Sequence, residues 1–408
     1  MKPSQGEIQQ NQARYYEVVV RATSDPLIAA AVSRQDPQQA HAAVAAKCPV
    51  RDLGDGIFAL TRMEDIRYVN KHPATEQGLK YLGSDRPAIP LGLDGAEHWK
   101  YRRLLDPVFT PKRVQPLAPQ VKQLANELID TFIDAGSCDA YAAWCQPLPS
   151  LMFLSIMGLP LDQLDNFIRF KNASLDLGDP DTPLEERLAR RAEAVTWIQD
   201  YFTADLDARE RESEPRDDMI QWLLSAEVDG DRLTRYELLD ILGLLMIAGL
   251  DTVASSLACF LSYFARHPEH RAQIVADPGL TRGADEELMR FESPVTEGSR
   301  VAREDLTLPS GALIPAGSWM HVSWSAANLD PDVFPEPLTV DFTRKPNPHI
   351  GFASGTHRCL GSHLARMEME VAVRAWHERI PDYSIAAGEE LVYAGNPRAP
   401  HRLPLVWR

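Results

Sequence analysis

One apolar run constrains this chain more than any other feature. Between Ile241 and Ala265 the only charged residue is Asp251, close to the centre. A continuous helix of that length extends about 37 Å, which is enough to cross a bilayer. Hydroxyl side chains dilute the run, however, and a carboxylate at the midplane of a membrane is costly. The sequence therefore predicts a long helix through the core of a large soluble protein, with no membrane span.

Size and charge narrow the class of protein. A chain of 408 residues buries roughly three quarters of its unfolded surface, which is ample for an enclosed apolar site. The net charge of −16 argues against nucleic-acid binding, because no basic field would attract phosphates. Five scattered cysteines are too few for a disulfide framework, which favours a cytoplasmic protein. Residues 1–15 are polar and no apolar segment follows them, so we expect no secretory signal peptide.

The pattern of apolar residues predicts a mainly α-helical fold with small β-sheets. Residues 1 to about 95 mix short helical patterns with a strand pair over 56–62. From 96 to about 290, apolar residues recur three and four positions apart, which is typical of helices. These predicted helices span 117–132, 183–209, 235–266 and 284–291.

Beyond Pro294 the residue pattern changes from helices to short strands and loops. Here we expect short strands over 306–308, 312–317 and 319–322, a proline-rich loop over 330–348, and a last helix from about 360 to 379. No repeat or flexible linker separates these stretches. The prediction is therefore one domain over residues 1–408.

A loop with two glycines, residues 352–361, carries Cys359 to the first turn of that last helix. Backbone N–H groups and the positive end of a helix dipole lower the pKa of a thiol there, and Arg358 adds positive charge. Such a thiolate could be a nucleophile, a zinc ligand or an axial haem ligand, although a lone cysteine is more commonly a buried structural residue. His357, Cys359 and His363 do not have a usual zinc spacing.

The same loop resembles a known family. Its residues fit the pattern Phe-x-x-Gly-x-His-x-Cys-x-Gly of the haem-binding loop in cytochromes P450, with Phe352, Gly355, His357, Cys359 and Gly361 at the fixed positions. The resemblance covers roughly residues 55–408 and is weakest over 150–220. Segments 340–344, 363–366, 380–386 and 403–407 look most like the camphor-hydroxylating bacterial branch. The resemblance implies a cytochrome P450 fold, with haem b buried between the long central helix and the cysteine loop, and Cys359 as the thiolate ligand of the iron.

Asp251 and Thr252 are the candidate catalytic residues. An unpaired carboxylate in an apolar helix costs several kcal/mol, so its presence suggests a function. Thr252 can bond back to a carbonyl four residues earlier, and Gly249 weakens the helix, so a polar notch could open here. The alternative is an aspartate paired with a neighbouring arginine, with Thr252 merely filling the helix. In the family, the Asp and Thr of a Gly-x-Asp-Thr motif form the acid–alcohol pair beside bound dioxygen. The resemblance therefore implies that Asp251 relays protons and Thr252 positions them.

Two further groups of residues follow from the resemblance. His98 and Arg102 lie four apart and share a helix face, which alone would be an exposed basic surface. The resemblance assigns them, with Arg300 and His357, to the haem propionates, which need cations or donors.

Glu287 and Arg290 lie three apart, a spacing typical of exposed ion pairs. The resemblance implies instead a buried structural pair, completed by an arginine from the proline-rich loop. Thr339 stands at the expected arginine position, which puts the usual three-residue network in doubt.

The substrate pocket is predicted by position. The residues expected to face the distal cavity are Leu91, Leu244, Ile247, Ala248 and Val295. Residues 84–90 contain no tyrosine of the kind that camphor hydroxylases use to bind the substrate ketone, and Tyr81 is the nearest. Camphor is therefore not expected to be the preferred substrate. An apolar pocket favours a terpenoid, a norisoprenoid or another hydrophobic small molecule.

The resemblance implies a haem-thiolate monooxygenase that uses dioxygen and electrons from a separate 2Fe-2S ferredoxin and its reductase. An acidic ferredoxin would need a local basic patch, for which the candidates are Lys100, Arg103, Lys112, Arg113, Arg358 and Arg366. Two alternatives remain open. A peroxide-driven peroxygenase would lack the acid–alcohol pair, and a haem-binding sensor or carrier would not take up electrons in response to substrate.

Overall fold

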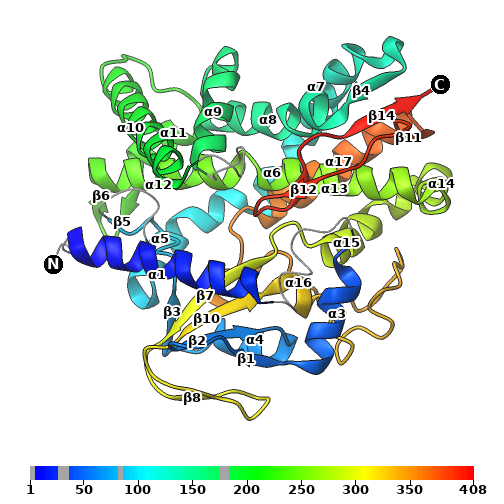
Figure 1. Cartoon of the computed structure of the whole chain (residues 1–408). Coiled ribbons are helices and arrows are strands. Elements are labelled where there is room, and N and C mark those ends of the chain that lie inside the picture. The colour runs from blue at the N-terminus through cyan, green and yellow to red at the C-terminus, as the bar shows by residue number, and fades with distance from the viewer. Residues whose placement is uncertain (1–4, 26–35, 81–85, 175–182) are drawn as a thin grey trace.

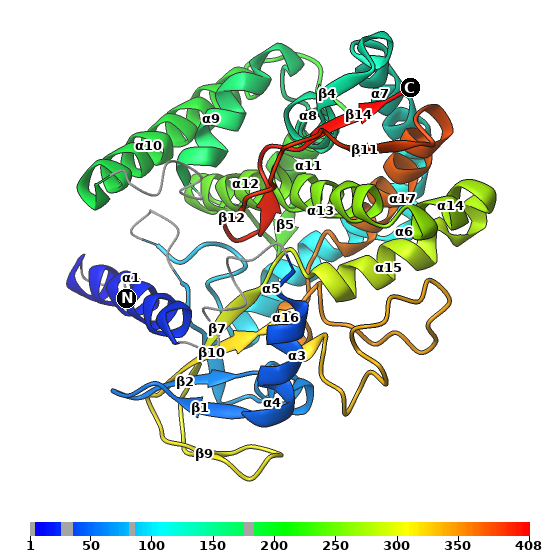
Figure 2. The ribbon, with the colours of Figure 1, turned by 45° about the vertical axis from the view of Figure 1, so that its right-hand side comes forward.

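The computed structural model describes residues 5–25, 36–80, 86–174 and 183–408, so Tyr81 lies outside the described residues. Figure 1 shows a large helical part above a smaller part built around a β-sheet, and Figure 2 shows the same division from another side. The helices are α1 (Gln5–Ser24), α3 (Gln38–Lys47), α4 (Met63–Val69), α5 (Gly95–Leu105), α6 (Pro111–Val114), α7 (Ala118–Asp130), α8 (Pro147–Met157), α9 (Leu164–Ser174), α10 (Leu184–Arg209), α11 (Met219–Ser225), α12 (Arg235–Gly249), α13 (Thr252–Arg266), α14 (Pro268–Ala276), α15 (Thr281–Glu292), α16 (Trp324–Ala327) and α17 (Ser362–Arg379).

The main sheet has five strands in the spatial order β1 (Val50–Asp52), β2 (Ile57–Leu60), β10 (Trp319–Ser323), β7 (Glu297–Ala302) and β3 (Thr75–Gln77). Strand β10 runs parallel to β2 and antiparallel to β7. This register places Arg300 of β7 between Met320 of β10 and Gln77 of β3. The sheet therefore joins three strands from residues 50–77 to two strands from residues 297–323.

Smaller sheets lie at the periphery. A three-stranded sheet has the order β11 (Tyr383–Ile385), β14 (Pro404–Trp407) and β4 (Ser137–Asp139). The remaining strands form antiparallel pairs: β5 (Glu227–Val228) with β6 (Asp231–Arg232), β8 (Leu306–Thr307) with β9 (Leu313–Ile314), and β12 (Tyr393–Ala394) with β13 (Ala399–Pro400). The predicted mainly helical fold with small sheets is confirmed.

The long apolar run forms two helices, α12 and α13, rather than one. A capping box at Thr234 and Glu237 begins α12. The backbone leaves helical geometry at Asp251, where φ is −127° and ψ is −33°. By length and hydropathy the stretch Arg235–Arg266 could span a membrane, but 72% of its apolar window is buried inside the molecule. The run is thus the core helix that the sequence predicts, broken at its only charge.

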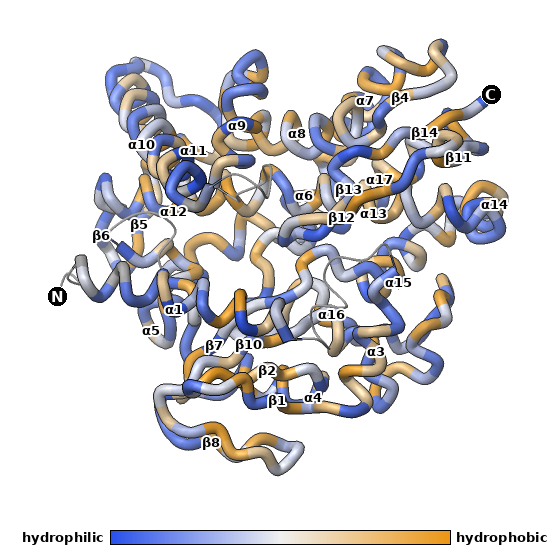
Figure 3. The backbone as a smooth tube through the Cα atoms, in the orientation of Figure 1, coloured by the Kyte–Doolittle hydropathy of each residue, from blue (hydrophilic) through white to orange (hydrophobic). Residues whose placement is uncertain are grey.

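Helix α13 forms the centre of the core. Its side chains from Val253 to Phe264 are buried, and they pack against α17 and the π-helical segment Tyr141–Cys145. Trp376 of α17 and Trp144 of that segment lie 4.9 Å apart between ring centroids. Hydrophilic and hydrophobic residues are mixed along the outer helices α10 and α14 in Figure 3, whereas α13 is mainly white to orange. Burial of large side chains around α13 holds the break at Asp251 in a fixed position, since each contributes roughly 1.5–3 kcal/mol.

Candidate functional site

The loop that carries Cys359 is held by backbone hydrogen bonds. The Cys359 N–H donates to the Phe352 carbonyl at 2.9 Å, and the Arg358 N–H donates to the Gly355 carbonyl at 3.3 Å. Gly355 has φ of +74°, and a Cβ atom there would lie 2.0 Å from the Asn70 carbonyl oxygen. Only glycine fits both conditions. Helix α17 begins at Ser362, so Cys359 lies just ahead of the first turn, not within it as the sequence predicts, because Leu360 and Gly361 form a turn of their own.

The surroundings of Cys359 act on its thiol in opposite directions. The residue is exposed to solvent, yet burial raises the pKa of its thiol. The Gly361 N–H and the cations of Arg102, Arg366 and Arg358 oppose this rise. The predicted lowering of the pKa is therefore wrong for the polypeptide alone, because desolvation outweighs the nearby positive charge.

One face of α12 is accessible to solvent. Ala248 is exposed and Leu244 and Ile247 are partly exposed, whereas Leu245 and Met246 on the same helix are buried. Val295 and Leu91, predicted for the same cavity, are likewise partly exposed. Accessible apolar side chains on a core helix are typical of a ligand cavity.

Asp251 is fully buried and forms an ion pair with Lys171 of α9. The Lys171 Nζ lies 2.6 Å from Asp251 Oδ1, and neither side chain is more than 1% exposed. Ser255 Oγ donates to the other carboxylate oxygen at 3.2 Å. The sequence left open a salt bridge to a neighbouring arginine; the structure provides a buried lysine from a distant helix instead.

Thr252 adopts the geometry that the sequence predicts. Its Oγ1 donates to the Ala248 carbonyl at 3.0 Å, and the residue is partly exposed. The hydroxyl therefore lies at the edge of the accessible face of α12. Behind it, Gly249 packs so closely on α8 that a Cβ atom would lie 2.6 Å from the Phe153 ring.

The structure brings the predicted propionate ligands together. The rings of His98 and His357 lie 4.3 Å apart, and Arg102 Nη1 donates to the Arg358 carbonyl at 2.8 Å. His357 Nε2 is 2.9 Å from Asp94 Oδ1. Arg300 is buried and donates to Gln77 Oε1 at 2.7 Å.

The side chains of His98, Arg300 and His357 would be stabilised by an anionic group, because burial disfavours their positively charged forms. Burial lowers the pKa of Arg300 to about 10, and burial together with His357 lowers that of His98 to about 4. His98 Nε2 is buried and has no hydrogen-bond partner among the described residues. An unpartnered buried donor is costly unless a ligand completes it. Two carboxylates, as haem b carries, would supply partners for these side chains.

The Glu287–Arg290 pair is fully buried, with Nη2 and Oε1 2.8 Å apart. Arg344 supplies the third member, since its Nε lies 3.0 Å from Glu287 Oε1. Thr339 takes part through its carbonyl, which accepts from Arg290 at 3.2 Å. The expected gap in the network is therefore absent: the arginine comes from a position a few residues further along the loop.

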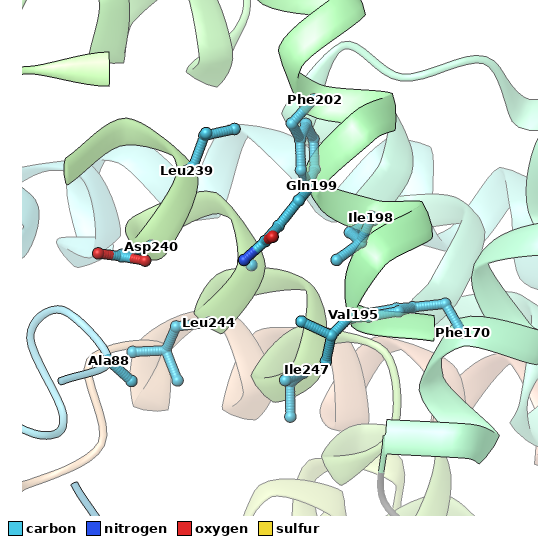
Figure 4. Close-up of a pocket in the computed structure, with 11 residues that line it drawn as sticks. Ala88, Phe170, Val195, Ile198, Gln199, Phe202, Leu239, Asp240, Leu244 and Ile247 are labelled. Carbon is cyan, nitrogen blue, oxygen red and sulfur yellow. The ribbon is translucent and has the colours of Figure 1, made fainter. Parts of the chain in front are cut away.

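A separate pocket lies between α9, α10 and α12 and has about 480 Å³ of empty space, including its solvent-open part. Figure 4 shows its lining residues: Ala88, Phe170, Val195, Ile198, Gln199, Phe202, Leu239, Asp240, Gly243, Leu244 and Ile247. Of the predicted substrate contacts, Leu244 and Ile247 line this pocket, and Leu91, Ala248 and Val295 do not. The sequence missed Gln199 and Asp240. The signal for Gln199 was a polar residue within the apolar stripe of α10.

The described residues do not support the zinc alternative at Cys359. Within that part of the chain, the one group of three potential metal ligands close enough to share an ion is His267, Glu269 and His270. His357 is bonded to Asp94 instead.

Comparison with known proteins gives consistent matches. The family profile for Cytochrome P450 matches residues 161–277 and 280–376. The vitamin D(3) 25-hydroxylase of Pseudonocardia autotrophica is 33% identical over 374 residues, covering 88% of this chain and 90% of that protein. The mycinamicin IV hydroxylase/epoxidase of Micromonospora griseorubida is 32% identical over 368 residues, covering 87% and 90%. Among solved structures, the myxobacterial cytochrome P450 CYP267B1 in complex with myristic acid superposes with a TM-score of 0.82. Its sequence is 31% identical to this chain, and the match covers 91% of this chain and 96% of that one.

Proposed function

This chain belongs to the cytochrome P450 family, and we propose that it hydroxylates a hydrophobic small molecule with electrons from a separate 2Fe-2S ferredoxin and its reductase. As a cytochrome P450 monooxygenase it binds haem b, which supplies the centre where dioxygen is reduced so that one oxygen atom enters the substrate and the other becomes water. The proposal places the whole chain, as one domain, in the cytoplasm. Its cysteines are all free, which fits a reducing compartment.

The observation that carries the proposal is that Cys359 is exposed and Thr252 is partly exposed, so that both side chains are accessible to a bound group. Cys359 lies on the loop before α17, and Thr252 lies at the junction of α12 and α13. Cys359 would hold the iron. His98, Arg102, Arg300 and the ring of His357 would hold the carboxylates of the cofactor.

Asp251 and Thr252 would divide the handling of protons. The Thr252 hydroxyl, oriented by the Ala248 carbonyl, would hold a proton at the edge of the cavity. Asp251 would carry protons inward from the polar groups packed behind it, of which Lys171 and Ser255 are bonded to it directly. The presence of both residues favours a dioxygen-using enzyme over a peroxygenase.

The substrate is proposed to be a terpenoid, a norisoprenoid or another hydrophobic molecule. Eight of the residues that line the pocket are apolar side chains, and Leu244 and Ile247 connect it to the accessible face of α12. Relatives are named for vitamin D(3) and mycinamicin IV, and one similar structure contains myristic acid. These ligands support a hydrophobic substrate class.

The ferredoxin is proposed to bind near the cysteine loop. Arg103, Lys112, Arg113 and Arg358 are exposed there, and they would offset the net charge of −16 locally. Arg366 contributes less, because it is bonded to Glu286 and lies over the Phe352 ring at 4.2 Å.

The test is the absorption spectrum of the reduced, carbon monoxide-bound protein. Thiolate ligation through Cys359 predicts a red-shifted Soret band. Cys359→His should keep haem and lose the shift, whereas Cys48→Ser, which removes a cysteine far along the chain, should leave it unchanged. A red-shifted band that survives in Cys359→His would show that another residue holds the iron. Substrate-dependent uptake of electrons from ferredoxin separates the enzyme from a sensor, and activity with peroxide alone would favour the peroxygenase.

A further inference from the structure

The pocket between α9, α10 and α12 is not uniformly apolar. Gln199 and Asp240 also line it, together with eight aliphatic and aromatic side chains. Figure 4 shows the two on facing helices, with Gln199 extending from α10 toward α12. Polar groups in such a setting fix the orientation of a ligand, provided that the protein does not already satisfy them.

Asp240 is already satisfied. Arg86 binds it with two hydrogen bonds, Nε to Oδ2 at 2.9 Å and Nη2 to Oδ1 at 3.1 Å. The guanidinium also lies over the Tyr236 ring, 4.7 Å from its centroid. The Asp240 side chain is only 6% exposed. This pair leaves little net charge at the pocket, so neither a cationic nor an anionic ligand gains from it.

Gln199 is not satisfied by the described residues. Its side-chain amide forms no hydrogen bond with any of them, and the residue is partly buried. Val195 and Phe202, one turn to either side on α10, line the same pocket and pack beside it. An amide held among apolar side chains gains free energy from any ligand oxygen that replaces the water it would otherwise bind.

We propose that Gln199 binds a hydroxyl or carbonyl oxygen of the substrate and is a specificity-determining residue of this enzyme. The substrate is then a neutral, mainly apolar molecule that already carries one oxygen function, with its apolar part toward Leu244 and Ile247. An amide both donates and accepts, so an alcohol and a ketone both fit. This inference rests on the proposed function, because it takes the pocket to be the substrate site. It also revises the sequence-based expectation of a pocket without directional polarity.

The experiment compares matched ligands on the holoenzyme by isothermal titration calorimetry. The pairs are limonene with carvone and cedrene with cedrol, in which one member lacks the oxygen. The variants are Gln199→Leu, which keeps the volume and removes the amide, and Thr196→Val as a control on the exposed side of α10. The ratio of dissociation constants within each pair cancels the hydrophobic contribution that both members share.

In Gln199→Leu, the affinity for the oxygenated member of each pair should fall roughly 3- to 10-fold relative to the affinity for its hydrocarbon. Thr196→Val should leave the ratio unchanged. The substitution should also broaden the distribution of hydroxylated products from carvone or cedrol, which a purely structural role would not cause. An unchanged ratio in Gln199→Leu, or no binding of either oxygenated compound to the wild-type protein, would overturn the inference.

The two proposals fail separately. The red-shifted Soret band depends on Cys359 and not on Gln199, so Gln199→Leu should keep the band whether or not Gln199 binds the substrate. If Gln199→Leu keeps the red-shifted Soret band and also keeps the wild-type ratio of dissociation constants, only the assignment of Gln199 is refuted. Loss of the band from the wild-type protein would refute the proposed function itself.

Discussion

Replacement of Asp285 should stabilise this protein. Asp285 lies on α15, is 4% exposed, and has no hydrogen-bond partner for either carboxylate oxygen among the described residues. Burial raises its pKa well above the usual range, and Glu370 and Glu286 add to the rise. An unsatisfied buried polar group costs roughly 1–3 kcal/mol. Asp285→Val should therefore raise the thermal midpoint by about 1 to 4 °C for a chain of this length.

The stabilisation by Asp285→Val should depend on pH, and the direction follows from the raised pKa of Asp285. The raised pKa means that folding favours the protonated carboxyl, so its contribution to stability is full below the unfolded pKa of about 3.9 and is lost as pH rises toward the folded value. The advantage of Asp285→Val over the wild type should then grow as pH increases from about 4 to neutrality.

Asp285→Asn is the matched control for that effect. It removes the titration and keeps a polar group, so its difference from Asp285→Val should not change with pH. Differential scanning fluorimetry of the three proteins between about pH 4 and 8 measures both differences, in a range set by the reference pKa of aspartate. Equal midpoints for wild type and Asp285→Val, or an advantage that shrinks as pH rises, would show that a partner satisfies this carboxyl.

Three further predictions concern the site and its support. Thr252→Ala should keep electron consumption and lose product, with the excess appearing as hydrogen peroxide, whereas Asp251→Asn should slow turnover and keep coupling; product yield per electron consumed separates the two. Arg344→Gln should lower the unfolding free energy by roughly 1–3 kcal/mol, because it removes one of two cations from the buried Glu287; denaturant unfolding checks this against Arg303→Gln on the surface. Arg103→Glu should slow reduction by ferredoxin and weaken its salt dependence, and identical stopped-flow rates at low and high salt for both proteins would contradict a basic docking patch.

The sequence predicted the elements that depend on local patterning. Helix α10 and strands β2, β8 and β10 lie within a few residues of the predicted bounds, because apolar periodicity and turn residues are read along the chain. The loop of Cys359 was recognisable for the same reason, since its fixed residues are contiguous. The start of α17 was predicted wrongly because the helical pattern does not distinguish the turn that precedes it, and the break at Asp251 within the predicted helix 235–266 was missed as well.

Contacts between side chains that lie apart in the sequence could not be predicted from the sequence. Thr339 stood where an arginine was expected, and the sequence could not show that Arg344 reaches Glu287 from further along the same loop. Gln199 lies in the segment where the resemblance is weakest, so only its place in an apolar stripe could have indicated a pocket. These contacts depend on how helices and loops meet, which no single pattern along the chain encodes.

The pairing of Asp251 with Lys171 shows what the structure adds to the motif. Replacing a buried ion pair by apolar side chains is often neutral or stabilising, so stability alone does not account for charges at both positions. The pair lies at the break between α12 and α13, where the backbone leaves helical geometry at Asp251. With its carboxylate held by Lys171 and Ser255, Asp251 lies beside Thr252 in sequence but is bonded to groups behind the helix. Proton delivery under the proposed function therefore requires the carboxylate to exchange Lys171 for a partner on the cavity side, and the strength of the ion pair sets the cost of that exchange.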